Sequence, residues 1–242
     1  MERITTRMLG TQVLELKNHL SRCRVELAGY VHGNEVVLAE YDAFGDTLLE
    51  AYVAGEGLID ADLRRIFDCT LFVAQAHRSQ SRKNASKTPY IIHPVAVAHL
   101  LAREGQVRDP DIVMAALLHD AIEDTDVTLE QVERSFSPRV ASFVAEVTDD
   151  PTLHWKEQRQ AQIDHAPNLS AGAAQIKLAD KLHNLLDIIR DPPLKWSAGR
   201  VQAYIGWAQQ VVDHLPWVNA HIKSKLDELF TMYWKQQRNR TS

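Results

Sequence analysis

Apolar residues recur with the period of an α-helix along almost the whole chain after residue 60. In one such run, Leu63, Ile66, Phe67, Leu71 and Ala74 follow the i, i+3, i+4 spacing that lines one helical face. The segments with this period are 63–74, 97–101, 112–122, 170–190, 198–214 and 218–236. No convincing run of alternating apolar and polar residues interrupts them, so we predict an all-α body.

The first 60 residues form a separate pattern with two apolar stripes at helical spacing, joined across Gly33-Asn34. The stripes are Val13, Leu16, Leu20, Cys23, Leu27 and Val37, Tyr41, Phe44, Leu48, Tyr52. They favour a helical hairpin, although Val25–Leu27 and Val36–Leu38 around Gly33-Asn34 also permit a β-hairpin. We therefore divide the chain into an N-terminal extension, 1–60, and a main domain, 61–238. The extension either packs on the body or provides a homodimer or partner contact.

Bulk properties limit the class of protein. The chain has 242 residues, 45% of them hydrophobic, and a formal net charge of −5. An acidic chain is unsuited to sequence-independent nucleic-acid binding, which requires a basic face. No run of about 18 apolar residues suggests a membrane span, and the N-terminus lacks the apolar core of a signal peptide. The two cysteines form no disulfide-rich pattern, and we expect a soluble cytoplasmic protein with free thiols.

The segment Ala115–Asp124 places four ionisable residues within six positions after a long apolar approach. They are the pair His119-Asp120 and, one helical turn later, the pair Glu123-Asp124. Burying polar groups without partners costs about 2–7 kcal/mol each. A bound cation would remove that cost, so this pattern indicates a metal-dependent enzyme.

Four residues are candidate metal ligands: His93, His119, Asp120 and Asp180. Two imidazoles and two carboxylates suit a divalent transition ion such as Mn, Fe or Zn. Glu123 and Asp124 follow the His-Asp pair by four residues and so share its helical face, where a carboxylate could orient or deprotonate water. Taken singly, His93 could be structural and Asp180 could pair with a neighbouring lysine.

Three phrases of the sequence make the ordered set more specific. They are Thr88–Pro94 with Arg82-Lys83 before it, Ala115–Thr125, and Ile176–Leu185. The order His … His-Asp … Asp resembles the HD phosphohydrolase superfamily, and the longer phrases resemble the hydrolase domain of the RelA/SpoT enzymes. Glu146–Asp150 and Arg200–Tyr204 are more similar to the stand-alone small alarmone hydrolases and their animal homologue. The resemblance covers about residues 62–236 and implies an HD-type helical bundle.

The resemblance implies an enzyme that removes the 3′-pyrophosphate of the alarmone ppGpp or pppGpp. Such an enzyme lowers the alarmone level in the stringent response. It implies a Mn²⁺ cofactor and a nucleotide substrate as the small-molecule partner. The implied metal ligands are His93, His119, Asp120 and Asp180, the catalytic pair is Glu123 and Asp124, and the substrate contacts are Arg82, Lys83, Asn184 and Tyr204. About 57 residues follow Asn184, so we expect no synthetase domain.

One segment departs from the pattern. Pro151 and Trp155 stand where the small hydrolases often carry lysines, although Lys156 and Arg159 lie nearby. The way the distal 5′-phosphates are held is therefore open, and with it the choice between ppGpp and other nucleotides. The alternatives are a ppApp hydrolase, an NADPH 2′-phosphatase on the same site, and a nucleotide sensor without activity.

Overall fold

The computed structural model describes residues 2–216 and 219–241. Within these residues, all the regular secondary-structure elements are helices. This confirms the predicted all-α class. The helices are α1 (Glu2–Tyr30), α2 (Glu35–Val53), α3 (Asp60–Ala76), α4 (Ile92–Arg103), α5 (Pro110–Leu118), α6 (Ala121–Asp124), α7 (Leu129–Ser135), α8 (Pro138–Val147), α9 (Trp155–His165), the 3₁₀ turn Ala166–Asn168, α10 (Ala171–Arg190), α11 (Ala198–His214) and α12 (Ala220–Thr241). None of the described helices is long and apolar enough to cross a membrane.

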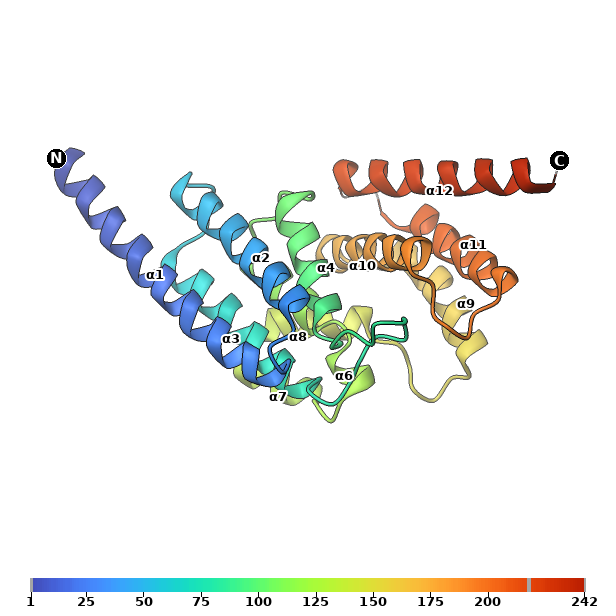
Figure 1. The fold of residues 1–242 in the computed structure, drawn as a ribbon, viewed down its shortest axis with the longest axis horizontal. Coiled ribbons are helices and arrows are strands. Elements are labelled where there is room, and N and C mark those ends of the chain that lie inside the picture. Colours follow the sequence, from blue (N-terminus) through green and yellow to red (C-terminus); the bar gives the residue numbers. More distant parts are fainter. Residues whose placement is uncertain (1, 217–218, 242) are drawn as a thin grey trace.

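The N-terminal extension is a helical hairpin, so the alternative of a β-hairpin is wrong. The chain reverses between α1 and α2 where His32 and Gly33 adopt positive φ angles of 52° and 70°. Asn34 then caps α2 by accepting a hydrogen bond from the Val37 amide. Figure 1 shows the two helices running side by side in blue along one flank of the molecule.

The apolar stripe of each extension helix faces the main body. α1 packs against α3, and α2 packs against α4. Leu16, Leu27, Tyr41, Phe44 and Leu48 are fully buried and belong to the same hydrophobic cluster as the body helices. The stripes therefore complete the core, and the predicted dimer or partner contact would have to use other faces of residues 1–60.

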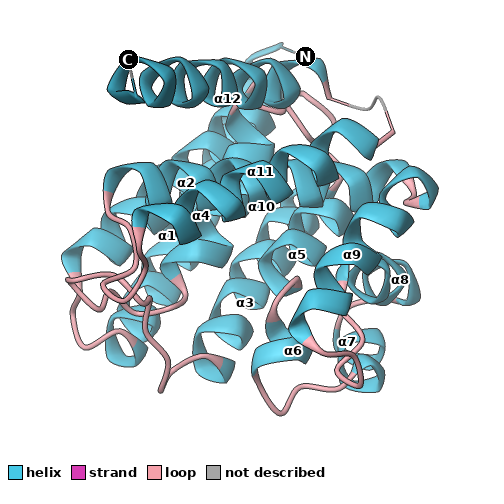
Figure 2. Ribbon diagram, turned by 90° about the vertical axis from the view of Figure 1, so that its right-hand side faces the viewer, coloured by secondary structure: helices cyan, strands magenta, loops and turns pink. Residues whose placement is uncertain are grey.

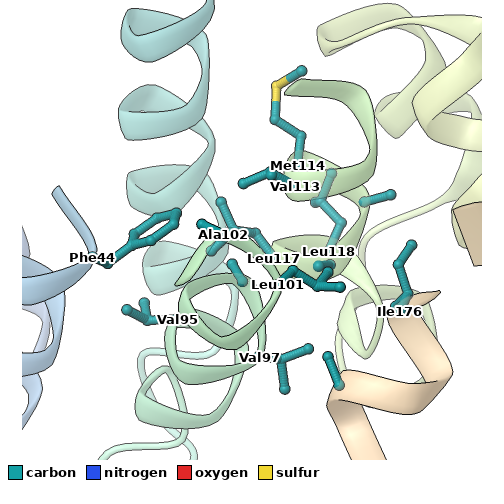
Figure 3. Close-up of a cluster of buried hydrophobic side chains, with 14 of the residues drawn as sticks. Phe44, Val95, Val97, Leu101, Ala102, Val113, Met114, Leu117, Leu118 and Ile176 are labelled. Carbon is teal, nitrogen blue, oxygen red and sulfur yellow. The ribbon is translucent and has the colours of Figure 1, made fainter. Parts of the chain in front are cut away.

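The centre of the core is formed by α4, α5 and α10. Every residue of α5 from Val113 to Leu118 is fully buried, as expected of a helix that is apolar on all sides. Figure 3 shows how Leu101 of α4, Leu117 and Leu118 of α5 and Ile176 of α10 meet there. α5 thus fixes the position of the polar residues that follow it.

The remaining helices surround this centre. α7 begins at a capping box in which Thr128 and Gln131 satisfy each other's backbone amides, and Pro138 occupies the first turn of α8. α9 and α11 pack together beyond α10, and α12 lies across α10 and α11. Figure 2 shows α12 above the other helices.

Replacing Phe44 by Ala tests whether the extension and the body unfold together. The side chain is fully buried in the shared cluster, so we expect the free energy of unfolding to fall by about 3–5 kcal/mol. Urea denaturation should give one cooperative transition at lower midpoint. The control is Val36→Ala on the same helix, whose side chain is exposed and whose loss should change the stability by no more than about 0.5 kcal/mol. Two separate transitions in Phe44→Ala, with the transition of the body at the wild-type urea midpoint, would contradict a shared core.

Candidate active site

The four candidate metal ligands come from separate parts of the bundle. His93 lies in the first turn of α4, His119 directly follows α5, Asp120 precedes α6, and Asp180 lies in the middle of α10. His93, His119 and Asp180 are almost completely buried. The ends of three helices and the middle of a fourth therefore deliver the four side chains to one point.

The donor atoms of these residues face one another. His93 Nε2 is 3.2 Å from His119 Nε2, 3.3 Å from Asp180 Oδ1 and 3.5 Å from Asp120 Oδ2. His119 Nε2 is 3.2 Å from Asp120 Oδ2 and 3.7 Å from Asp180 Oδ1. Ligands at about 2.0–2.2 Å from a common ion are separated by roughly 3.0–3.5 Å, so His93, His119 and Asp180 fit one divalent cation, with Asp120 Oδ2 beside both histidines.

Surrounding groups orient the donors. The Ala116 carbonyl oxygen lies 2.8 Å from His119 Nδ1, which suits a proton on Nδ1 and leaves the Nε2 lone pair facing the centre. The Tyr90 hydroxyl donates to Asp120 Oδ2 at 2.5 Å, and the Asn184 amide donates to Asp180 Oδ1 at 2.6 Å. Such outer partners hold metal ligands in place.

The electrostatics of the cluster also favour a cation. Burial lowers the pKa of His93, which keeps its imidazole neutral as a metal ligand must be. Burial opposes ionisation of Asp180, but Lys181 and the nearby histidines outweigh it and hold the Asp180 pKa well below its usual value. Although burial disfavours a charged imidazole, Asp120 and Asp180 raise the pKa of His119 to about 9. Two ionised carboxylates in a buried site therefore attract positive charge.

Lys181 pairs with Asp180, as the sequence allowed for one of the neighbouring lysines. Lys181 Nζ is 3.1 Å from Asp180 Oδ2, whereas Lys177 Nζ donates to the Val147 carbonyl oxygen. The ion pair uses one carboxylate oxygen, and Oδ1 still faces His93 and His119. The pair is thus compatible with a metal site.

The second acidic pair lies on α6 beside the cluster. Glu123 Oε1 accepts a hydrogen bond from the Asp149 amide at 2.5 Å. Desolvation of the carboxyl group, aided by the charges of Asp149 and Asp120, raises the pKa of Glu123 to about 7. Burial and the Asp120 charge also raise the pKa of Asp124. A carboxyl group that titrates near neutrality is suited to transferring protons.

All four predicted substrate-contacting residues line one cavity of about 440 Å³, and Asp124 of the acidic pair lines it too. Arg82 Nη2 donates to Asn184 Oδ1 at 3.1 Å and to Asp187 Oδ2 at 3.0 Å. Tyr204 packs against Trp196, with ring centroids 5.5 Å apart. The cavity joins the metal-ligand cluster through Asn184, which contacts both Arg82 and Asp180.

Several residues of the site carried no clear signal in the sequence. His183 places Nδ1 2.8 Å from His93 Nδ1. Asp187 holds Arg82, and its place seven residues after Asp180 on α10 could have indicated it, because positions i and i+7 share a helical face. Tyr90 lies three residues before His93, but the bond that it makes to Asp120 depends on the fold.

The altered segment after Asp150 builds a cluster of rings and cations. Trp155 is exposed and has Arg159 over its ring at 5.3 Å. Arg159 also lies 5.0 Å from the centroid of Trp207 and 5.7 Å from that of Tyr204. Trp155 stands where a lysine was expected, and Arg159, which lies over its ring, also lies beside the ring of Tyr204. Tyr204 lines the cavity, so a positive charge is present next to the cavity.

Comparisons with known proteins show which family this chain resembles. The model of the HD domain family matches residues 70–200. The guanosine-3′,5′-bis(diphosphate) 3′-pyrophosphohydrolase MESH1 of Danio rerio is 49% identical over 159 residues, which are 66% of this chain and 88% of that protein. MESH1 of Homo sapiens is 45% identical over 170 residues, 70% of this chain and 95% of that protein. The bifunctional (p)ppGpp synthase/hydrolase SpoT of Escherichia coli (strain K12) is 34% identical over 181 residues, 24% of its length.

A solved structure has the same fold. It is described as a metazoan orthologue of SpoT that hydrolyses ppGpp and plays a role in starvation responses, and it matches with a TM-score of 0.69 and 43% identity over 70% of this chain and 95% of that one. The family model covers more than half of this chain, and most of each MESH1 protein aligns with it. The chain therefore belongs to the HD-domain family, as a relative of the MESH1 and SpoT hydrolases.

Proposed function

We propose that this protein is a metal-dependent hydrolase that removes the 3′-pyrophosphate of ppGpp or pppGpp, giving GDP or GTP and pyrophosphate. The observation that carries the proposal is the joining of two features. A cluster of His93, His119 and Asp180 that fits a divalent cation, with Asp120 beside both histidines, adjoins a cavity lined by basic and aromatic side chains. The MESH1 relatives carry the name of this activity.

We propose His93, His119, Asp120 and Asp180 as the ligands of the cation, with Mn²⁺ as the ion. Imidazole and carboxylate donors are common to Mn²⁺, Fe²⁺ and Zn²⁺ sites. A divalent cation held there would polarise a phosphoryl oxygen and lower the pKa of water towards neutrality. Asn184 and Tyr90 keep the aspartate oxygens directed to that point.

Glu123 is the proposed proton-handling group and Asp124 its assistant. The pKa of Glu123 lies near 7, so its carboxylate can accept a proton from the attacking water at neutral pH. Asp124 lines the substrate cavity, where it can exchange a proton with the departing 3′-oxygen. Water would add to phosphorus, the bond from phosphorus to the 3′-oxygen would break, and the 3′-oxygen would leave as a hydroxyl group.

The residues proposed to hold the nucleotide are Arg82, Lys83, Asn184 and Tyr204, with Trp196 beside Tyr204. Arg82 and Lys83 supply positive charge for phosphate, and Arg82 is held in place by Asp187. Tyr204 and Trp196 supply ring faces on which a purine can stack. Stacking does not by itself separate guanine from adenine, so ppApp is the second candidate substrate for this cavity.

Replacing Asp180 by Asn tests the metal ligands. At 100 times its dissociation constant, a cation that binds only the native state adds about 2.7 kcal/mol of stability. We expect Mn²⁺ to raise the melting temperature of the wild-type protein and to have little effect on Asp180→Asn, measured by differential scanning fluorimetry. Asp126→Asn, which alters an exposed acidic residue outside the cluster, is the control that should keep the full shift. An unchanged shift in Asp180→Asn would exclude Asp180 as a ligand.

Replacing Glu123 by Gln tests both the reaction and the role of this carboxyl group. With Mn²⁺ and ppGpp, we expect the wild-type protein to release pyrophosphate and Glu123→Gln to lose about 10²–10⁴-fold in kcat, with its metal content unchanged by elemental analysis. Parallel assays with ppApp and NADPH, following pyrophosphate and phosphate, determine the substrate. Release from none of the three by wild-type protein loaded with metal would favour the nucleotide sensor, and full activity of Glu123→Gln would refute its role.

The pH dependence of kcat/KM tests the same carboxyl group in the wild-type protein. Glu123 must be ionised to accept a proton, and its pKa is raised to about 7. The rate should therefore rise with pH along an acid limb whose midpoint lies at or below 7, since a neighbouring cation favours the ionised form. The limb should be missing from the residual activity of Glu123→Gln. Metal content measured at each pH separates this titration from loss of the cation.

A further inference from the structure

A second cluster of metal-type donors lies where the N-terminal extension meets the body. His19 and Cys23 are four residues apart on α1, and Asp68 lies on α3. None of the three is among the residues that line the active-site cavity in the described part of the chain. We call these three residues the hairpin cluster.

The donor atoms of the hairpin cluster converge. His19 Nε2 is 3.0 Å from Asp68 Oδ1 and 3.7 Å from Cys23 Sγ, and Cys23 Sγ is 3.9 Å from Asp68 Oδ1. A tetrahedral zinc ion with bonds of about 2.0 Å to N and O and about 2.3 Å to S separates its N and O ligands by roughly 3.3 Å. It separates S from either by roughly 3.5 Å, so adjustments of a few tenths of an ångström would complete the geometry.

A buried hydroxyl group beside the cluster gives independent support. The Tyr41 side chain is fully buried, and its Oη has no hydrogen-bond partner. Burial, aided by the Asp68 charge, raises the pKa of the Cys23 thiol to about 11, and the Tyr41 hydroxyl opposes that rise, which places the hydroxyl next to the sulfur. An unmade bond to a buried hydroxyl costs about 1–3 kcal/mol. A thiolate at Cys23 would be a strong acceptor for that hydroxyl, whereas a neutral thiol is a weak one.

A simple ion pair between His19 and Asp68 explains less. It accounts for the 3.0 Å contact, but it leaves the Tyr41 hydroxyl without an acceptor. Arg22 Nη2 lies 3.3 Å from His19 Nδ1, and a metal-bound His19 would carry its proton on Nδ1. Arg22 is exposed, so it can turn away into solvent when the cluster is loaded.

We propose that His19, Cys23 and Asp68 bind a divalent transition ion, with zinc as the favoured one, through His19 Nε2, Cys23 Sγ and Asp68 Oδ1. The mixed sulfur, nitrogen and oxygen donors select zinc or cobalt over magnesium or calcium. The Asp68 side chain is 61% exposed, so water can supply the fourth ligand. Binding releases the Cys23 proton and gives Tyr41 its acceptor.

The consequence is a metal cross-link between the extension and the body. α1 would be joined to α3 by ligands from both helices, in addition to the apolar stripe that already packs there. A cation that binds only the folded state stabilises it. This role is structural and does not depend on the hydrolase activity.

Titration of the metal-free full-length protein with Co²⁺ tests the proposal. The chain has two cysteines, Cys23 and Cys69, and the active-site cluster contains neither. A thiolate-to-cobalt charge-transfer band in the near ultraviolet therefore reports on a cysteine ligand alone. We expect the band in the wild-type protein to saturate with one equivalent bound at the hairpin cluster, and Zn²⁺ to displace it.

Two variants and one control identify the ligands. Cys23→Ala should abolish the band, and Asp68→Asn, an exposed change that leaves the core intact, should weaken Co²⁺ binding at least tenfold. Cys69→Ala is the matched control, because Cys69 is also buried but its Sγ is directed to the Met114 carbonyl oxygen; it should keep the band. Absence of the band in the wild-type protein, its persistence in Cys23→Ala, or an unchanged affinity in Asp68→Asn would overturn the proposal. Circular dichroism of each variant separates loss of a ligand from loss of the fold.

Discussion

The structure depends on holding two carboxylates and two imidazoles together inside an apolar bundle. Isolated charges in such a place are costly, and here the Nε2 atoms of His93 and His119 lie 3.2 Å apart and 3.2–3.7 Å from oxygens of Asp120 and Asp180. The ion pair with Lys181 and a proton on His119 balance the carboxylates when no cation is bound, and a rigid core must hold the group in place. The fully buried segment Val113–Leu118 of α5, packed between α4 and α10, provides that rigidity directly before His119.

The extension contributes to the same task from outside. α2 packs on α4, the helix that carries His93 in its first turn. His99 of α4 is anchored to α2 by Glu40, 2.6 Å from Nδ1, and by Thr47, 3.1 Å from Nε2. α1 in turn packs on α3, which contacts α5. Residues 1–60 thereby support α4, which carries His93, and α3, which packs on α5. A cation in the hairpin cluster would strengthen the contact between α1 and α3.

The substrate cavity combines two kinds of recognition. Arg82 is fixed by Asp187 and Asn184, so its charge is oriented before a phosphate arrives and little side-chain entropy is lost on binding. The rings of Trp196 and Tyr204 also line the cavity. Tyr204 contacts both Trp196 and Trp207, and Arg159 lies over the rings of Tyr204 and Trp207. Asn184 joins both parts by contacting Arg82 and Asp180. A nucleotide held by its ring and its phosphates would thus be fixed at both ends relative to the metal cluster.

The sequence by itself determined the features that the helical period controls. The all-α class of the body, the cap at Thr128 and the pairs at i and i+4, such as Asp180 with Asn184, follow from local spacing. For the extension, the spacing favoured two helices but left a β-hairpin open. Tertiary structure alone decided which residues meet across helices: His183 against His93, Tyr90 against Asp120, and the hairpin cluster between α1 and α3. The physical reason is that periodicity sets which face of a helix a residue occupies, whereas the partner on the facing helix depends on how the helices pack.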